Sequence, residues 1–411
     1  MARVLVPNGA AQAVVSSLRA LTRRGDHCEL ACESRRRRGR SVYVRDIRWL
    51  PSASRGSEQF VQGLLGLVRA RPYDVLLPFT TDGVYAISKH AAEFPPDGPG
   101  FAVPPIDSFL TVHDKGRLTA LCERLGIGFP RSFAGLGEDG IADVSDEIRY
   151  PAVVKARQSL GGGHGVRFAG SKAELLRAYD EVRKTRSLSV VEDFENPLVQ
   201  EFIPGPVHDV CALALEGKVV NVLTMCRVLM LPVSGGITAV GVTTRNAELE
   251  ALARTLLEEL SWHGPAELEF KHDPVDGRYK LLEVNPRFWG TVDLAIRVGM
   301  DFPGMVRDYV LGEPVRPGLR YPVGVRYRFL LPRAVLAYLQ LVREVGLWGA
   351  RDPHRYARTM YDVDLSDWSY ELRRVAGTAR AVYGRSYLPQ SGVPRSHLPT
   401  PARADWARGG G

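Results

Sequence analysis

Two short strand-forming segments separated by a tight turn constrain the fold of this 411-residue chain more than any other feature. Glu267 and Glu269 alternate along the first segment, ELEF. Glu283 and Asn285 alternate along the second, LLEVN, and the sequence DPVDG between them has the Pro, Asp and Gly typical of a tight turn. Side chains two residues apart on a strand point to the same face. We therefore expect a β-hairpin that gathers carboxylate and amide oxygens on one face.

Oxygen ligands of this kind suit Mg²⁺, which proteins commonly bind through one or two carboxylates together with the phosphates of a substrate. The hairpin alone leaves a second interpretation open, in which its polar face is merely solvated. An upstream segment, YPAVVKARQSLGGGHGV, favours the metal site: Lys155 ends an apolar run, and the following loop contains Gly161, Gly162, Gly163 and Gly165. Glycines let backbone N–H groups wrap an anion, and a lysine supplies a point charge for phosphate oxygens. The loop matches neither the Walker pattern nor GxGxxG.

Five segments of the chain, in this order, resemble the motifs of the ATP-grasp superfamily. They are DK at 114–115, VVK with the Gly-rich loop at 153–165, VQEFIPGP at 199–206, ELEFK at 267–271 and LLEVNPR at 281–287. Only 8 of the 54 basic residues are Lys, and Lys115, Lys155 and Lys271 lie inside these motifs. An ammonium differs from a guanidinium in geometry and hydration, so this coincidence favours a specific role for the three lysines.

The resemblance implies that ATP lies between two subdomains, with two lysines on its phosphates and the Gly-rich loop folded over them. Backbone groups of the VQEFI segment would read the adenine edge. The Glu that commonly follows GP in this superfamily is replaced by Val207, which leaves Asp209 as the candidate for the ribose hydroxyls. The implied nucleotide contacts are Lys115, Lys155, Gly161, Gly162, Gly163, Gln200, Glu201, Ile203 and Asp209.

The same resemblance implies the metal site and the catalytic residues. Glu269, Glu283 and Asn285 match the metal-binding positions, where two Mg²⁺ ions, or Mn²⁺ in their place, would bridge phosphate oxygens. Arg287 would stabilise the transferred phosphoryl group. Arg227 would clamp a substrate carboxylate, or else form structural salt bridges.

The resemblance implies a two-step reaction. A substrate carboxylate attacks the γ-phosphate of ATP to give an acyl phosphate, and an amine or similar nucleophile then displaces phosphate. Two alternatives remain. One is phosphorylation of a small acid such as bicarbonate, as in carbamoyl phosphate synthase or a carboxylase, because NPRFWG resembles that branch closely. The other is a non-catalytic ATP-binding module, which retention of the lysines and the metal set argues against.

The domain organisation follows from the alternation of strand-forming and helical segments. ARVLVP, QAVVSSLRALTRRG and HCELAC begin a βαβ pattern, which predicts a parallel sheet flanked by helices. We expect an α/β and α+β fold: a Rossmann-like domain at 1–104, a two-subdomain ATP-grasp domain at 105–320 with its lid at about 130–198, a mainly helical extension at 321–388 and a disordered tail at 389–411.

Charge and composition limit the partners. No apolar run is long enough for a membrane span, so a cytoplasmic location is the default. No aromatic residues interleave with the basic run RRRRGR, so we expect no nucleic acid. The extension and tail at 321–411 hold 14 Arg against 7 acidic residues, which suits an anionic substrate or an acidic carrier or partner protein, unless these arginines only solvate a helical appendage. A homodimer is the default assembly for such enzymes.

Overall fold

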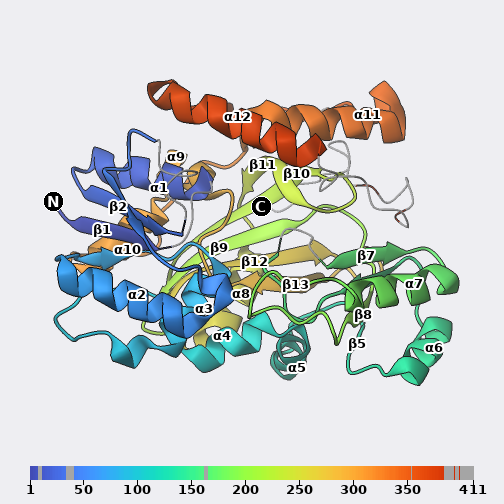
Figure 1. The fold of residues 1–411 in the computed structure, drawn as a ribbon. Helices are drawn as coiled ribbons and strands as arrows, with labels where there is room; N and C mark the ends of the chain where they lie inside the picture. Colours follow the sequence, from blue (N-terminus) through green and yellow to red (C-terminus); the bar gives the residue numbers. More distant parts are fainter. Residues whose placement is uncertain are drawn as a thin grey trace.

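The computed structural model describes residues 1–7, 12–33, 41–161, 165–352 and 354–383, together with Val393 and Leu398. Its N-terminal part holds a four-stranded parallel sheet of order β3-β2-β1-β4 flanked by helices (Figure 1). The elements are β1 (Arg3–Pro7), α1 (Gln12–Arg23), β2 (His27–Cys32), β3 (Asp46–Trp49), α2 (Ser57–Ala70), β4 (Val75–Leu76) and α3 (Thr81–Lys89). Val14, Leu18 and Leu21 recur at helical spacing on α1 and are fully buried. The predicted α/β pattern is confirmed.

A seven-stranded sheet of order β13-β12-β9-β10-β11-β14-β15 forms the centre of the molecule. Its strands pair antiparallel except for β14 and β15, which are parallel. They are β9 (His208–Leu215), β10 (Lys218–Leu231), β11 (Ile237–Thr244), β12 (Gly264–His272), β13 (Tyr279–Asn285), β14 (Val325–Arg328) and β15 (Arg358–Tyr361). The helices around it are α4 (Ile106–His113), α5 (Lys115–Leu125), α8 (Ala247–Glu259), α9 (Val292–Arg297) and α10 (Phe302–Val310).

Strand alternation gives this sheet two buried faces. On β9, Cys211 and Leu213 pack into the core that also holds α1, α9 and α10, whereas Val210 and Ala212 pack against α8. All four side chains are fully buried. Period-2 alternation sends successive side chains to opposite faces. The central sheet therefore has the N-terminal domain on one side and α8 on the other.

The lid is a separate four-stranded antiparallel sheet of order β5-β8-β6-β7. Its elements are β5 (Ser132–Phe133), α6 (Glu138–Glu147), β6 (Ala152–Lys155), β7 (Val166–Ala169), α7 (Lys172–Arg183) and β8 (Leu198–Glu201). Figure 1 shows this layer beside the free edge of the central sheet, next to β12 and β13. The predicted Gly162 and Gly163 contacts lie outside the described residues.

The extension is mainly helical, as expected, but it also contains two short strands that were not expected. Helices α11 (Val335–Gly349) and α12 (Trp368–Tyr383) are present, but β14 and β15 add two strands to the central sheet. In β14 and the residue after it, Val325, Tyr327 and Phe329 are 2%, 0% and 1% exposed, which is the period-2 burial of a strand. A boundary at residue 320 would divide one sheet, so we extend the unit that contains this sheet to residue 361.

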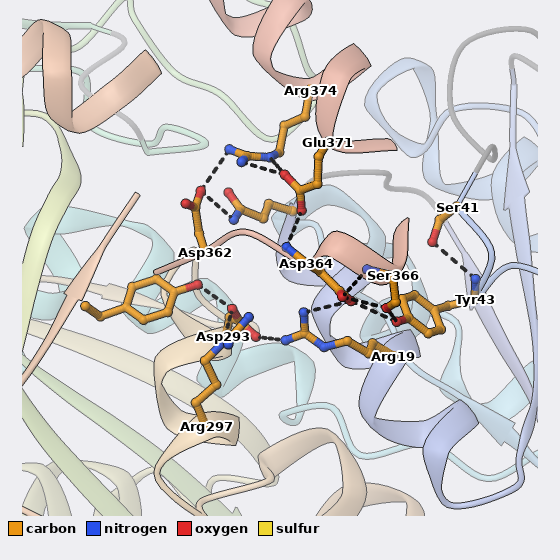
Figure 2. Close-up of polar contacts among 12 residues, drawn as sticks. Arg19, Ser41, Tyr43, Asp293, Arg297, Asp362, Asp364, Ser366, Glu371 and Arg374 are labelled. Atoms are coloured by element: carbon orange, nitrogen blue, oxygen red, sulfur yellow. Dashed lines mark hydrogen bonds and ion pairs between the residues drawn. The ribbon is translucent and has the colours of Figure 1, made fainter. Parts of the chain in front are cut away.

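Polar contacts join the extension to the N-terminal domain (Figure 2). Arg19 on α1 forms ion pairs with Asp293 on α9 and with Asp364. Asp362 accepts from Gln12 Nε2 at 2.9 Å and pairs with Arg374 on α12 at 2.8 Å. We call this set, Gln12, Arg19, Asp293, Asp362, Asp364 and Arg374, the junction network. It links α1 and α9 to the loop after β15 and to α12.

The tail and the longer helices bear on two further expectations. Most of the predicted disordered tail lies outside the described residues, but Leu398 is 4% exposed and packs with β10, β11 and α11. Among the helices that the structure describes, none is long and apolar enough to cross a membrane.

Candidate active site

The hairpin brings the expected oxygens together. β12 and β13 pair antiparallel with Glu269 opposite Glu283 and Glu267 opposite Asn285. Residues directly opposite in an antiparallel pair share a face, so the four side chains form one polar patch. The Asn285 amide donates to Glu267 Oε2 and to Glu269 Oε1, each at 3.2 Å. Its Oδ1 accepts from Arg287 Nη2 at 3.3 Å.

Arg227 lies inside a group of carboxylates rather than in open space. Its Nε lies 2.8 Å from Asp209 Oδ2, and its Nη2 lies 2.8 Å from Asp209 Oδ1 and 2.6 Å from Glu269 Oε1. Glu267 Oε1 lies 3.6 Å from the same nitrogen. The Arg227 side chain is 9% exposed, and a buried charge needs such partners. Of the two alternatives for Arg227, the geometry therefore favours structural salt bridges, while the substrate clamp stays a prediction.

Asp209 is also in a different environment from the predicted one. It lies on β9 opposite Glu269 and is fully buried. Each of its carboxylate oxygens lies 2.8 Å from a nitrogen of Arg227. It does not line the cavity described below. The ribose contact of Asp209 therefore stays a prediction, which the burial of its carboxylate and its ion pair with Arg227 do not favour.

The structure adds two acids to the predicted metal set. Ligand atoms of Asp209, Glu267 and Glu269 lie within 4.8 Å of one another. Only Glu269 belongs both to this group and to the predicted set of Glu269, Glu283 and Asn285. Arg227 already neutralises part of the Asp209 group, so the side of the patch formed by Glu283 carries the more available negative charge.

Burial and neighbouring charges move the pKa values of the acids apart. Burial raises the pKa of Glu269 to about 7, although Arg227 opposes the shift. Burial would also raise the pKa of Glu283, but Lys115 and Lys155 reverse the effect and lower it below its ordinary value. Glu283 is therefore the more firmly ionised carboxylate of the opposing pair. This difference suits a site in which a cation displaces a proton from the second ligand.

The lysines of the motifs converge on the hairpin. Asp114 caps α5 by accepting from the Gly116 and Arg117 N–H groups, which places Lys115 at the first turn, where its Nζ donates to Ser159 Oγ at 3.2 Å. Burial lowers the pKa of Lys115, and it lowers the pKa of Lys155 to about 8.

Lys271 lies near the end of β12 and lines the cavity described below. Its Nζ donates to the Ile203 carbonyl at 2.8 Å and lies 4.9 Å from the centre of the Phe202 ring. Burial, together with nearby Lys155, lowers the pKa of Lys271 to about 7. Depressed pKa values mean that these ammonium groups lack sufficient negative partners. A polyphosphate would supply them, so the donor set fits a nucleotide with its metal.

A cavity of about 390 Å³ lies between the lid sheet and the hairpin. Among the predicted residues, the cavity is lined by Lys155, Gly161, Gln200, Glu201, Ile203, Arg227, Glu269, Glu283, Asn285 and Arg287. Lys115 lines a smaller neighbouring pocket that shares Gly161, Glu283 and Asn285 with it. Most of the residues chosen from the motifs therefore meet around one space.

The segment proposed to read adenine is only partly available. The Glu201 N–H donates to the Arg131 carbonyl at 3.0 Å, and the Ile203 carbonyl accepts from Lys271. Gln200 is 3% exposed, and its side chain donates to Ser132. The Ile203 N–H is thus the donor on which an adenine contact would rest.

Several residues around the site belong to none of the motif positions assigned a role above. Thr81 accepts from Arg287 Nε at 3.2 Å, so the N-terminal domain reaches the hairpin. Phe202, Ser234 and Arg333 line the cavity. No pattern in the sequence marks Arg333, because it reaches the cavity through long-range packing.

Comparison with known proteins gives consistent findings. The model of the family described as "ATP-grasp in the biosynthetic pathway with Ter operon" matches residues 193–328. The carbamoyl phosphate synthase large chain of Deinococcus deserti is 29% identical over 192 residues, which are 44% of this chain and 18% of that protein. The D-aspartate ligase of Enterococcus faecium is 27% identical over 250 residues, which are 56% of this chain and 58% of that protein. The chain thus covers less than two thirds of either relative.

The fold has similar solved structures. The biotin carboxylase domain of Hydrogenobacter thermophilus 2-oxoglutarate carboxylase, in complex with MgADP, ADP and bicarbonate, superimposes with a TM-score of 0.63 at 17% identity. The match covers 79% of this chain and 73% of that one. At this level of identity the likeness shows the fold alone. Together with the ordered motifs and the family model that matches residues 193–328, it shows that this chain carries ATP-grasp motifs on an ATP-grasp-like fold.

Proposed function

We propose that this protein is an ATP-dependent ligase that activates a substrate carboxylate as an acyl phosphate and joins it to an amine, releasing ADP and phosphate. The observation that carries the proposal is the convergence of under-neutralised lysines and opposed carboxylates on one cavity. The similarity to D-aspartate ligase supports the formation of a C–N bond.

The residues take separate roles in this proposal. Lys115 and Lys155 neutralise the phosphates, and Arg287 lies where charge accumulates on the transferred phosphoryl group. Glu269, Glu283 and Asn285 would hold two Mg²⁺ ions, or Mn²⁺, whose positive charge lowers the repulsion between phosphate and the attacking carboxylate.

The two steps balance without an enzyme nucleophile. A substrate carboxylate oxygen forms a bond to the γ-phosphorus, and the bond to the ADP oxygen breaks. The amine nitrogen then bonds to the acyl carbon, phosphate leaves with its electron pair, and the nitrogen loses a proton to water. The chain contributes charge neutralisation and orientation to both steps.

An ADP-release screen of the purified full chain tests the proposal. Each of a set of amino acids and small acids is offered with Mg²⁺ and ATP, with and without an amine acceptor, and the products are analysed by mass spectrometry. The expected result is ADP release that depends on both an acid and an amine. ATP binding without ADP release under any condition would instead support a non-catalytic module.

A second candidate is phosphorylation of a small acid alone. The similarity to a carbamoyl phosphate synthase large chain favours it. ADP release with bicarbonate and no organic acid would identify this activity, and its absence would exclude it.

The partners remain proposals. Arg343, Arg351, Arg358 and Arg373 on the extension are exposed, which suits docking of an acidic carrier or partner protein. We also propose a homodimer as the assembly. Sedimentation analysis tests the assembly. Loss of binding to an acidic carrier protein at high salt would distinguish electrostatic docking from apolar contact.

A further inference from the structure

One end of the cavity is formed by the turn between β10 and β11. Ser234, Gly235 and Gly236 of this turn line the cavity. Ser234 is only 5% exposed, and within the described part of the chain its Oγ has no hydrogen-bond partner. Buried hydroxyl groups nearly always have a partner, because an unpaired one loses its bonds to water without replacement. The Ser234 hydroxyl therefore indicates a ligand atom in the cavity.

Arg333 brings a positive charge to the same end of the cavity. The guanidinium carbon lies 4.2 Å from the centre of the Phe329 ring, and Nη1 donates to the Thr238 carbonyl at 3.0 Å. Thr238 belongs to β11, which begins directly after the turn. These contacts fix the guanidinium beside the turn that carries Ser234.

The turn itself is held from two sides. The Val233 N–H donates to Gln340 Oε1 of α11 at 2.8 Å. A Cβ at Gly236 would lie 2.4 Å from the Leu231 carbonyl oxygen, so only glycine fits there. A Cβ at Gly235 would lie 3.4 Å from Phe168 of the lid strand β7. The turn is therefore packed between the extension and the lid, and its polar groups are positioned before a ligand binds.

Charge distinguishes this end of the cavity from the hairpin end. Arg227 is balanced by Asp209 and Glu269, and Arg287 contacts Asn285 and Thr81. The described lining residues include four acids, and all of them belong to the VQEFI segment or to the hairpin: Glu201, Glu267, Glu269 and Glu283. The lining residues of the turn and of β11, from Ser234 to Thr238, include no acid. The turn and the start of β11 therefore add no carboxylate to the cavity lining beside Ser234.

We propose that Ser234 and Arg333 form a subsite for a carboxylate of the substrate, separate from the carboxylate that is phosphorylated. This inference rests on the proposed ligase function and names its substrate class: a small dicarboxylic acid, which includes the acidic amino acids. The guanidinium neutralises the carboxylate, and the Ser234 hydroxyl donates to one of its oxygens. The subsite belongs to the extension and the β10–β11 turn, so it determines substrate choice without altering nucleotide contacts.

Calorimetric binding to the full chain tests the subsite. The probes are succinate, L-aspartate and D-aspartate. Succinate is compared with uncharged succinamide, and each aspartate is compared with the asparagine of the same configuration, in which an amide replaces the side-chain carboxylate. Inorganic phosphate is a further probe. Each is titrated with and without Mg²⁺ and a non-hydrolysable ATP analogue. We expect at least one carboxylate probe to bind at least tenfold more tightly than its amide.

Two variants assign that preference to residues. Arg333→Gln should weaken binding of the carboxylate probe at least tenfold, and Ser234→Ala should weaken it several-fold, with the affinity for the ATP analogue within twofold of wild type. Arg343→Gln is the matched control, because Arg343 is an exposed arginine of α11 outside the cavity. If Arg333→Gln does not fold, as judged by its melting curve, Ser234→Ala carries the test.

The outcomes separate the two proposals. No preference for any carboxylate over its amide, full retention of that preference in Ser234→Ala and in folded Arg333→Gln, or tighter binding of phosphate than of every carboxylate would overturn the subsite. Failure to bind the ATP analogue would overturn the ligase proposal instead. An Arg333-dependent carboxylate preference would then still stand as a binding property of the chain.

Discussion

Glu269 and Glu283 face each other across the hairpin, yet they differ in how firmly they hold a proton. The pKa of Glu269 is raised to about 7 by burial, and that of Glu283 is lowered by two nearby lysines. Identical side chains thus acquire different charges from their surroundings. Glu283 is the residue whose negative charge the site maintains at neutral pH.

We predict that Glu283→Gln lowers the ATP turnover rate by about 100-fold or more, because a neutral amide would hold Mg²⁺ less firmly than a carboxylate, and the bound cation offsets negative charge on the phosphates. Turnover at saturating Mg²⁺ and the melting curve of the variant check this. Glu248→Gln, an exposed substitution in the first turn of α8, is the control. Turnover within about threefold of wild type would remove Glu283 from the metal site.

A second prediction at this scale concerns Lys155 and pH. Its pKa in the free protein is lowered to about 8, and bound phosphates would raise it. At pH 8, Lys155 should therefore take up about half a proton when ATP binds, and above pH 8 the affinity should fall as this lysine loses its proton. Titration calorimetry in buffers of different ionisation enthalpy measures the total uptake, to which Lys271 with its pKa of about 7 also contributes. Lys155→Met should lower this uptake by about half a proton. Equal heats in every buffer would contradict the assigned contact.

Sequence alone predicts those site residues whose spacing is local. Glu269, Glu283 and Asn285 could be placed on one face because strand alternation and a tight turn fix their positions. The engagement of Asp209 by Arg227 could not be predicted, since it depends on the register of β9 against β10 and β12. The position of Arg333 at the cavity was harder still to predict, because Arg333 follows β14, a strand that the sequence did not reveal.

At the scale of elements, β14 and β15 make part of the extension an integral part of the central sheet. β14 pairs with β11, from Val240 opposite Arg328 to Val242 opposite Arg326, and β15 continues the sheet in parallel. The strand is only four residues long and lies after a segment rich in Pro and Gly, which conceals its alternation. The strands of the N-terminal domain and the hairpin were predictable, because longer apolar or alternating runs mark them.

We predict that truncation before Tyr321 prevents folding, rather than only lowering activity. It removes Tyr327 and Phe329 from the core and leaves β11 as an exposed edge strand. Soluble yield and the melting curve measure the effect. Truncation after Pro389 is the comparison: it should retain turnover and lower the melting temperature by only a few degrees, from loss of the buried Leu398 side chain. A soluble, fully active shorter chain would contradict this view of the extension.

At the scale of the whole molecule, the junction network joins α1 of the N-terminal domain to α9 and to the segment that follows β15 (Figure 2). Asp362 is its most buried carboxylate: the side chain is 0% exposed and also accepts from the Leu330 N–H at 2.8 Å. Removal of one partner from such a buried pair leaves the other charge without compensation.

We predict that Asp362→Asn lowers the free energy of unfolding by about 3 kcal/mol, because it removes the charge of a fully buried carboxylate that pairs with Arg374. The control is Asp146→Asn, which breaks the exposed pair with Lys172 and should cost less than about 1 kcal/mol. Denaturant unfolding at pH 7 compares the two variants. ATP affinity should be unchanged in both. Equal stabilities would show that the junction network contributes no more than a surface pair.

The position of β14 and β15 late in the sequence also affects when the fold can be completed during translation. During translation, the motifs that would bind ATP leave the ribosome before residues 325–364, which complete the central sheet and contact α1 through Asp362 and Asp364. Until then, β11 has an unpaired edge, and Arg19 lacks its partner Asp364. Because domains mature in the order in which their contacts become available, the nascent chain would hold its nucleotide motifs in an unfinished scaffold. Competence to turn over ATP would therefore arise late in synthesis, after the strand that precedes Arg333 has joined the sheet.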